Sequence, residues 1–276
     1  MPSPTGWRHN LRAGACAQVS SLFGHLGSQV LAFFRYFGEL ALLHWDIWKG
    51  LLRGHLSLRE TLKQMADIGI GSLPIAVITL VFSGMVLAYH VAHTASRYGA
   101  GSLVGYGVAE SVCRELGPVL VAIVVAARAG SSMAAEIGTM KVTEQIDALR
   151  AMAVHPVDYL VAPRYVAGVI LLPVLAFIGD VVGVLGGYAM AAISPYINEA
   201  TYFGSIPGSV LPWEILAGLV KALVFGVIIV LVGCHQGLYC EMASEEVGRA
   251  TTRAVVYSIM IIYGVDLALT AVLYPV

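Results

Sequence analysis

The sequence predicts an all-α integral membrane protein with five membrane-spanning helices. Of its 276 residues, 58% are apolar and only 12% are charged, whereas soluble domains carry about 25% charged residues. Five stretches are long and apolar enough to cross a hydrocarbon core of ~30 Å, which takes roughly 20 residues of helix. These runs lack the period-two alternation of a membrane β-barrel, so we expect helices.

The five predicted spans differ in the charges that they contain. The first has none, the second has Arg114 and Glu115, the third Asp180, the fourth Lys221 and the fifth Asp266. In order, the spans cover residues 68–89, 103–127, 165–193, 215–232 and 254–273. A charge at this depth costs at least ~2.5 kcal/mol on insertion scales, so each should face protein or a watery cavity. Asp180, Lys221 and Asp266 could form a proton relay, satisfied polar contacts or part of a cavity wall.

Residues 30–53 form a sixth apolar stretch, which carries a charged stripe. On a helical wheel, one side holds large apolar groups such as Leu40 and Leu51, and five charged side chains lie within roughly 40° of a line on the other. These are Arg35, Glu39, Asp46, Lys49 and Arg53. A helix in the headgroup plane keeps such a stripe wet, so we predict an interfacial helix; the alternative is a sixth span with its stripe turned into the bundle.

The chain is predicted to have three parts, and the distribution of basic residues predicts their orientation in the membrane. We expect an N-terminal cytoplasmic segment (1–29), an interfacial helix with its connector (30–66), and a transmembrane domain (67–276). With the N-terminus inside, thirteen Lys and Arg lie in cytoplasmic segments and one, Arg97, lies outside. Cytoplasmic loops carry the excess of basic residues. The sequence therefore predicts a cytoplasmic N-terminus and an external C-terminus.

The loop between the second and third spans has helical patterning from Ala134 to Met152, and Pro156 marks its end. Apolar residues such as Ile137 and Leu149 alternate with charged ones. A short amphipathic helix of this kind can rest on lipid or insert into the groove of a cytosolic partner. A surface helix with no partner fits the pattern equally well.

The segment CRELGP, residues 113–118, lies near the middle of the second span. Glu110 precedes Arg114 by four residues, a spacing that lets the two pair along one helix face. Pro118 removes a backbone donor, so we expect a kink near Gly117. Charge beside a kink suits a cavity for an amphiphile with a charged headgroup, with Arg114, Glu115 and Glu110 as binding residues. An internal ion pair that joins two helices is an equal alternative.

Three glycines spaced by four, Gly179, Gly183 and Gly187, lie in the third span. Small residues at this spacing let helix backbones approach closely, so we predict a packing role.

Several functional classes are not supported by the sequence. There is no GxxxxGK[ST] phosphate loop, so this chain should not hydrolyse ATP itself. No GxSxG or HExxH motif indicates an enzyme, and the four cysteines show no metal-ligand spacing. The net charge of −1 argues against a nucleic-acid partner. We therefore expect no catalytic residue, metal or cofactor in this chain itself.

Two motifs resemble a known family. Residues 114–156, RELGPVLVAIVVAARAGSSMAAEIGTMKVTEQIDALRAMAVHP, closely resemble the central signature of the MlaE (YrbE) permeases, the membrane subunits of ABC lipid transporters that work with MCE-domain proteins. GRATTRAVVYS, residues 248–258, followed by the DLALTAVL of residues 266–273, is a second match. The resemblance extends over roughly residues 30–275.

The resemblance implies a fold, partners and site residues. Two copies of this chain, most simply a homodimer, would enclose a lipid cavity, with Arg114 and Glu115 near the lipid headgroup or the cavity wall. An MlaF-type cytosolic ATPase, which binds the ATP and Mg, would dock on each loop helix, and an MCE-domain (MlaD-like) protein would exchange the lipid. The residues implied at the coupling contact with the ATPase are Glu136, Gly138, Thr139, Lys141, Glu144, Gln145 and Asp147.

The function expected from these observations is that of an ABC-transporter permease in a bacterial inner membrane, moving lipids, most simply phospholipids, between that membrane and an MCE-domain partner. The alternative from another class is an ion-coupled secondary transporter that uses Glu115, Asp180 and Asp266 as a proton path. Against it stands the lack of a visible inverted repeat, which many such carriers show.

Overall fold

The computed structural model describes residues 6–54, 56–191, 193, 199–208 and 212–274, with side chains from Gly27 onward. Residues 1–45 and 46–276 form two units. Every regular element in the described ranges is helical. The all-α prediction is therefore confirmed.

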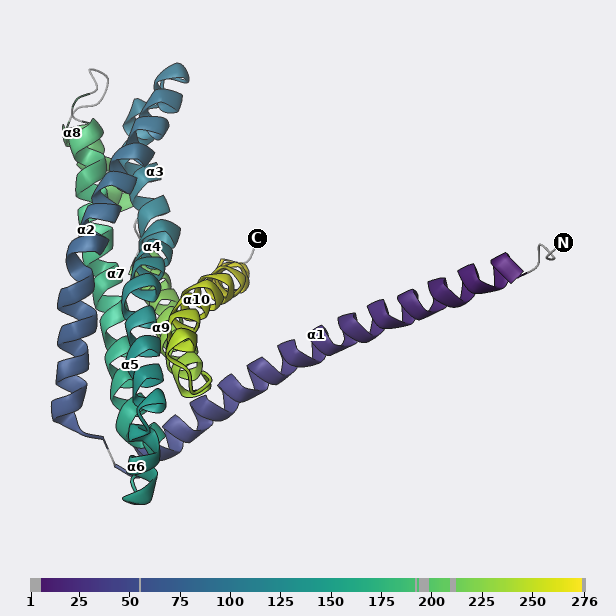
Figure 1. The fold of residues 1–276 in the computed structure, drawn as a ribbon. Helices are drawn as coiled ribbons and strands as arrows, with labels where there is room; N and C mark the ends of the chain where they lie inside the picture. Colours follow the sequence, from purple (N-terminus) through teal and green to yellow (C-terminus); the bar gives the residue numbers. More distant parts are fainter. Residues whose placement is uncertain (1–5, 55, 192, 194–198, 209–211, 275–276) are drawn as a thin grey trace. The chain divides into compact units, whose positions relative to one another are not determined.

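Five helical segments of the described chain are long and apolar enough to cross a membrane. They are α2 (Leu58–Arg97), a composite second segment (Gly101–Val142), a third made of η4 (Val157–Val161) and α7 (Ala162–Ala191), α9 (Pro212–Leu238) and α10 (Ser244–Leu273), all seen in Figure 1. Each predicted span lies within one of these segments, except that α7 ends at Ala191, two residues before the predicted end. The helices extend beyond the apolar runs because their polar ends reach past the hydrocarbon.

Helix α1 runs from Gly6 to Leu52, so the predicted interfacial helix is helical but begins well before residue 30. Its end agrees with the prediction within a residue. In the last part of α1, Ile47 is fully buried, and Gly50 packs against the carboxyl group of Asp158 in η4. The absence of a Cβ at Gly50 leaves room for that carboxyl group. The placement of α1 in the headgroup plane stays a prediction.

The second segment is a continuous helix with two irregular turns. It consists of η1 (Gly101–Leu103), α3 (Val104–Ser111), η2 (Val112–Leu116), α4 (Gly117–Val125), η3 (Ala126–Gly130) and α5 (Ser131–Val142). Both η2 and η3 are π-helical turns, which are frequent at functional sites and kinks. The π-helical turn η2 ends immediately before Gly117, where a kink is predicted, and Pro118 directly after Gly117 withholds a backbone donor.

The predicted single helix from Ala134 to Met152 is wrong in one respect, because the segment is broken in two. Helix α5 ends at Val142, and the short helix α6 covers Gln145–Ala151. Glu144 between them has φ 58°, a left-handed conformation that an α-helix cannot include. Ala153 has φ 58° as well, so a residue with a left-handed backbone conformation lies on each side of α6.

Helices α2 and α7 approach each other through glycines. A Cβ on Gly84 would overlap the carbonyl oxygen of Gly183, and one on Gly186 would meet the backbone of Val81. A Cβ on Gly187 would lie 2.7 Å from a methyl group of Val108, and one on Gly179 would lie 2.8 Å from a methyl group of Leu80. The packing role predicted for the third-span glycines is therefore confirmed, since close approach of backbones replaces side-chain interdigitation here.

Replacing Gly84 by Val should destabilise the protein by about 3 kcal/mol, the upper range for overpacking, because the obstructing atom belongs to the backbone of Gly183 and cannot rotate away. The loss is measured as a lowered thermal unfolding temperature of the purified chain in detergent. Gly248→Ala on α10 is the control, since open space surrounds that position. Equal unfolding temperatures for Gly84→Val and the wild type would contradict this packing.

A hydrophobic cluster holds α2, α3 and α7 together near the short helix α8 (Glu199–Ser205). Val104, Val108 and Tyr202 are among its buried members. The Tyr202 hydroxyl donates a hydrogen bond to the carbonyl oxygen of Val184 at 3.0 Å, and burial raises the pKa of the Tyr202 phenol. This cluster fixes the end of the bundle opposite to α6 (Figure 1).

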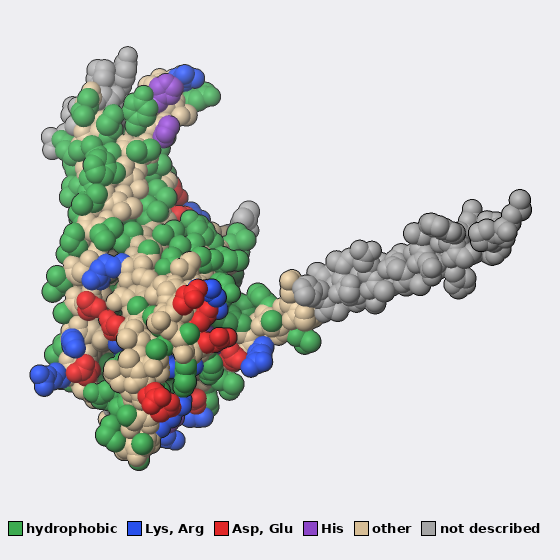
Figure 2. Space-filling view, in the orientation of Figure 1, with side chains coloured by type: hydrophobic (Ala, Val, Ile, Leu, Met, Phe, Trp, Pro, Cys, Tyr) green, Lys and Arg blue, Asp and Glu red, His purple; other side chains and the backbone are tan. Residues whose placement is uncertain are grey.

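The surface of residues 46–276 separates apolar from charged side chains. Figure 2 shows hydrophobic side chains along the flanks and Lys, Arg, Asp and Glu gathered toward the end that carries α5 and α6. Large apolar groups such as Ile70, Phe82 and Leu267 are strongly exposed in the single chain. A soluble protein rarely exposes so much apolar surface, whereas a bilayer covers it.

Candidate functional site

Lys221 of α9 is the centre of a polar cluster buried between membrane-spanning helices. Its side chain is 0% exposed, and its Nζ lies 2.7 Å from Oε2 of Glu115 and 3.1 Å from Oδ1 of Asp266. Nζ also donates to the hydroxyl of Thr270 at 2.8 Å, which in turn donates to Oε1 of Glu115 at 3.1 Å. We call Glu115, Lys221, Asp266 and Thr270 the buried charge cluster. It connects η2, α9 and α10 through charge-assisted hydrogen bonds.

The buried charge cluster reaches the surface through Glu115, whose side chain is 35% exposed. Beside it, Arg114 and Glu110 form the predicted i,i+4 ion pair, with Nη1 of Arg114 3.3 Å from Oε1 of Glu110. The Arg114 guanidinium also lies 3.5 Å from the ring centroid of Tyr274, a cation–π contact. Arg114 and Glu115 thus bring charge of both signs to a partly open surface at the π-helical turn.

Asp180 of α7 does not join the buried charge cluster. It is buried, and neither carboxylate oxygen accepts a hydrogen bond from any residue in the described ranges. A Cβ on Gly117 would overlap its Oδ1, so the carboxyl group packs directly on the backbone of α4. The three acids proposed for a proton path therefore do not lie together. Glu115 and Asp266 both contact Lys221, whereas Asp180 lies outside the buried charge cluster.

The residues implied at the ATPase contact fall into two groups. Thr139, Glu144, Gln145 and Asp147 are exposed on α5, α6 and the break between them. Gln145 donates to the Thr143 hydroxyl at 3.1 Å, and this local hydrogen bond leaves the Gln145 side chain exposed. These four residues present a polar surface around the left-handed turn.

The other three residues of that set contact other helical segments of the chain or the residues that follow them. Gly138 is buried, and its close neighbours are Cys240 and Val247. Lys141 donates to the carbonyl oxygen of Leu238 at 2.8 Å and so caps the end of α9. Glu136 accepts a bond from Nη2 of Arg164 at 2.7 Å. Gly138 and Lys141 therefore join α5 to the ends of α9 and α10.

The neighbourhood of Gly138 contains a buried thiol. Cys240 is buried just after α9, and burial raises the pKa of its thiol. Nearby Lys141 lowers that pKa in part. A thiol held protonated in this way is a poor nucleophile and metal ligand.

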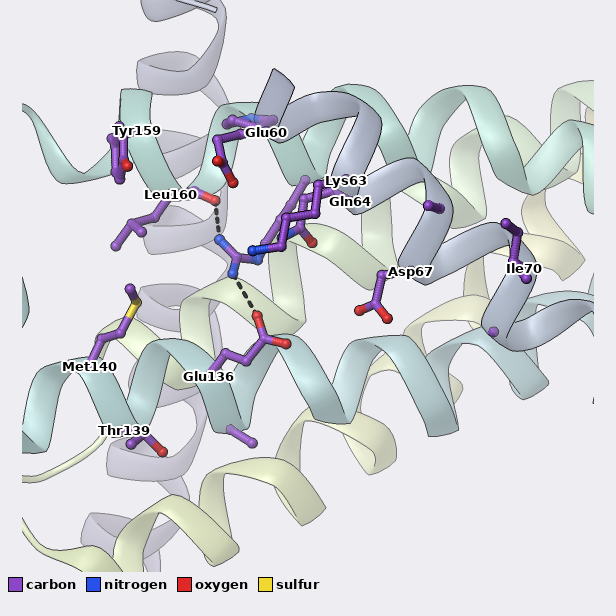
Figure 3. A pocket seen from close by; sticks show the side chains of 15 residues that line it. Glu60, Lys63, Gln64, Asp67, Ile70, Glu136, Thr139, Met140, Tyr159 and Leu160 are labelled. Carbon is purple, nitrogen blue, oxygen red and sulfur yellow. Dashed lines mark hydrogen bonds and ion pairs between the residues drawn. The ribbon is translucent and has the colours of Figure 1, made fainter. Parts of the chain in front are cut away.

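A polar cavity of about 1090 Å³ opens between α2, α5 and η4/α7. Its lining contains Glu60, Lys63 and Gln64 from α2, Glu136 and Thr139 from α5, and Tyr159 and Arg164 from the third segment. Figure 3 shows Glu60, Lys63 and Gln64 extending toward the space that Glu136 faces from α5. We call this space the polar cavity.

Arg164 has a fixed position in the lining of the polar cavity. Its side chain is 8% exposed, and besides Glu136 it donates from Nη1 to the carbonyl oxygen of Leu160. The dashed lines in Figure 3 mark these two interactions. Arg164 therefore ties α5 to the beginning of the third segment.

The family profile described as Permease MlaE matches residues 61–272, which include the buried charge cluster and the loop with α6. The chain belongs to the MlaE permease family. This MlaE-family chain is therefore a permease, and together with its five membrane-spanning helices this makes it a multi-pass membrane protein.

Curated relatives agree with this assignment over nearly the whole chain. A probable ABC transporter permease protein of Rickettsia felis is 39% identical over 251 residues, covering 91% of this chain and 97% of the relative. The intermembrane phospholipid transport system permease protein MlaE of Haemophilus influenzae is 37% identical and covers 93% and 98%. The chloroplastic protein TRIGALACTOSYLDIACYLGLYCEROL 1 of Arabidopsis thaliana is 34% identical and covers 84% and 71%.

Two features of this MlaE-family permease escaped prediction from the sequence. The pairing of Lys221 with Glu115 and Asp266 had one available signal, since a lone cation in a span needs an anionic partner at similar depth. In the sequence, Arg164 is one of the thirteen basic residues of the predicted cytoplasmic segments, and nothing there indicates a buried ion pair. Its partner Glu136 lies 28 residues away, so no local spacing indicates the pair.

Proposed function

We propose that this MlaE-family permease moves lipids, most simply phospholipids, as the membrane subunit of an ABC transporter. Two copies would enclose a lipid-binding cavity, and a separate MlaF-type ATPase would bind ATP and Mg and drive the movement. An MCE-domain partner would receive or deliver the lipid. The family membership and the phospholipid-transport relative from Haemophilus influenzae support this proposal.

The observation that carries the proposal is the partly open position of the buried charge cluster. Lys221 is enclosed, whereas Glu115, Glu110 and Arg114 retain about a third of their side-chain exposure. In the single chain these charges lie on a face bordered by α10, which exposes apolar residues such as Met260 and Leu267. A second copy against α10 would convert this face into a chamber with apolar walls and a charged patch. That combination suits an amphiphile with a charged headgroup.

The contact with the ATPase is proposed at α6 and the turn before it. Glu144, Gln145 and Asp147 supply the exposed polar surface, and Thr139 adds to it from α5. Movement of α6 would reach the spans through Glu136 and Arg164, because that ion pair joins α5 to the third segment. ATP binding needs to favour one permease state by only a few kcal/mol to shift the population.

The proposed setting is the bacterial inner membrane, with the N-terminus and α6 in the cytoplasm and the C-terminus outside. The distribution of basic residues supports this orientation, since Arg150 and Lys141 lie at the same end as α6. Figure 2 agrees, because the charged side chains gather at that end.

Co-purification of the tagged chain from its native membrane tests the proposal. In mild detergent, we expect mass spectrometry to find an ATPase with a phosphate loop, an MCE-domain protein and a defined lipid class in the eluate. A chain that purifies alone, without an ATPase in several detergents, would contradict the proposal.

An ion-coupled carrier is the second candidate function, and one observation favours it. Asp180 is a buried carboxyl group without a hydrogen-bond partner among the described residues, an arrangement found in proton-binding sites of membrane carriers. Such a carrier needs no ATPase and depends on the proton gradient.

A further inference from the structure

We propose that the polar cavity is a second lipid site, which binds the zwitterionic headgroup of a membrane phospholipid on the flank of this chain. The site is separate from the buried charge cluster, and its occupancy does not depend on transport. Its ligand class is a phosphate ester that also carries an ammonium group, such as phosphatidylethanolamine. The inference rests on the depth, the charges and the rigidity of the cavity lining.

The polar cavity lies at the depth of lipid headgroups. On α2 the charged residues Glu60, Lys63 and Asp67 line it, and no Asp, Glu, Lys or Arg follows until Arg97. Ile70, 74% exposed, lines the cavity at the start of this apolar stretch. The cavity thus straddles the boundary between the charged and apolar zones of the helix, where a lipid has its phosphate and the first carbons of its acyl chains. Basic residues in pockets between membrane helices, here Lys63 and Arg164, are the groups that bind the phosphates of lipid headgroups.

The charges of the cavity match a zwitterion. Glu136 is paired with Arg164, and Asp67 lies 3.7 Å from Arg128. Glu60 and Lys63 remain, and in the part of the chain that the structure describes neither makes an ion pair. One free carboxylate and one free ammonium complement the amine and the phosphate of a single headgroup. An anionic headgroup would meet Glu60 without compensation.

One cation of the lining has a fixed position. Nη1 and Nη2 of Arg164 donate to Leu160 and Glu136, and Nε is enclosed by protein. The guanidinium therefore places a positive charge at a fixed point of the cavity wall, and it loses little freedom when a ligand binds beside it. The volume of about 1090 Å³ slightly exceeds the usual range of ligand pockets, roughly 300–1000 Å³.

Native mass spectrometry of the purified full-length chain tests the site. Delipidated protein is mixed with phosphatidylethanolamine or phosphatidylglycerol of identical acyl chains, and bound lipid is counted. Lys63→Ala should lower the occupancy of both lipids about threefold, because both contain the phosphate. Glu60→Gln should lower the occupancy of phosphatidylethanolamine about threefold and leave the occupancy of phosphatidylglycerol unchanged or higher.

Arg59→Ala is the matched control, since Arg59 precedes Glu60 on α2 but does not line the cavity. It should change neither occupancy, which separates the cavity from lipids bound elsewhere on the chain. All three variants should unfold at the wild-type temperature because their side chains lie at the surface or in open space.

Three results would overturn the proposal. The first is equal headgroup preference in Glu60→Gln and the wild type. The second is that glycerophosphoethanolamine, the same headgroup without acyl chains, binds as tightly as the lipid, which would indicate a site for a soluble ligand. The third is that Lys63→Ala and Glu60→Gln retain lipid but lose a co-purifying ATPase, which would make the cavity a protein-docking surface.

Discussion

Lys221→Met should destabilise the permease by about 3 kcal/mol and abolish lipid transport. The substitution keeps most of the side-chain volume but leaves Glu115 and Asp266 facing each other without their shared cation. Breaking a buried ion pair by removing one partner costs ~3–5 kcal/mol, because the remaining charge stays desolvated. The lower figure applies here since Glu115 is 35% exposed. Thermal unfolding of the detergent-purified chain should shift downward by roughly 10 °C.

A compensated variant separates the structural from the transport role of the buried charge cluster. Lys221→Met combined with Glu115→Gln and Asp266→Asn removes all three charges, so no buried charge is left unpaired. We expect most of the lost stability to return, because replacing a whole ion cluster is close to neutral. Transport should remain absent if the charges contact the lipid. Transport at the wild-type rate in this stable variant would show that the cluster only joins helices.

The double charge reversal Glu144→Lys with Asp147→Lys should lower recovery of the ATPase at least tenfold in co-purification. Both residues are exposed around the left-handed turn that precedes α6, so the change acts on a partner and leaves the spans folded. Like charges brought together across an interface cost several kcal/mol, and 1.4 kcal/mol already corresponds to a tenfold change in affinity.

The matched control for this reversal is Glu245→Lys at the beginning of α10. Glu245 is exposed, and among the described residues it is paired with Arg249 alone, on the surface; such surface pairs contribute little stability. Its reversal should leave ATPase recovery and the unfolding temperature unchanged. If Glu144→Lys with Asp147→Lys retains the ATPase as the control does, the contact lies elsewhere on the chain.

The spans could be predicted from the sequence because a bilayer requires long apolar runs, and α2, α9 and α10 each contain one. The Glu110–Arg114 pair was predictable for a related reason, since its partners are one helical turn apart. The family motifs also predicted that the loop between the second and third spans and the residues around it are functional. Local pattern and motif together thus predicted the helices and one ion pair within a helix.

The tertiary contacts could not be predicted in this way. Glu115 and Lys221 are 106 residues apart, and Lys141 reaches Leu238 across 97 residues, so only the packing of whole helices brings them together. The break at Glu144 lacked a signal as well, because a glutamate with positive φ is uncommon and the surrounding pattern is helical. Residues assigned by resemblance alone, such as Gly138, needed the structure to reveal that they are buried.

We propose that this permease moves lipid at the expense of ATP. The most direct test is transfer of a labelled phospholipid in proteoliposomes that contain the co-purified complex, measured with ATP, with a non-hydrolysable analogue and with a proton ionophore. We predict transfer that requires hydrolysable ATP, is lost in Lys221→Met and is unaffected by the ionophore. Transfer that proceeds without ATP and collapses with the proton gradient would contradict the claim and favour an ion-coupled carrier.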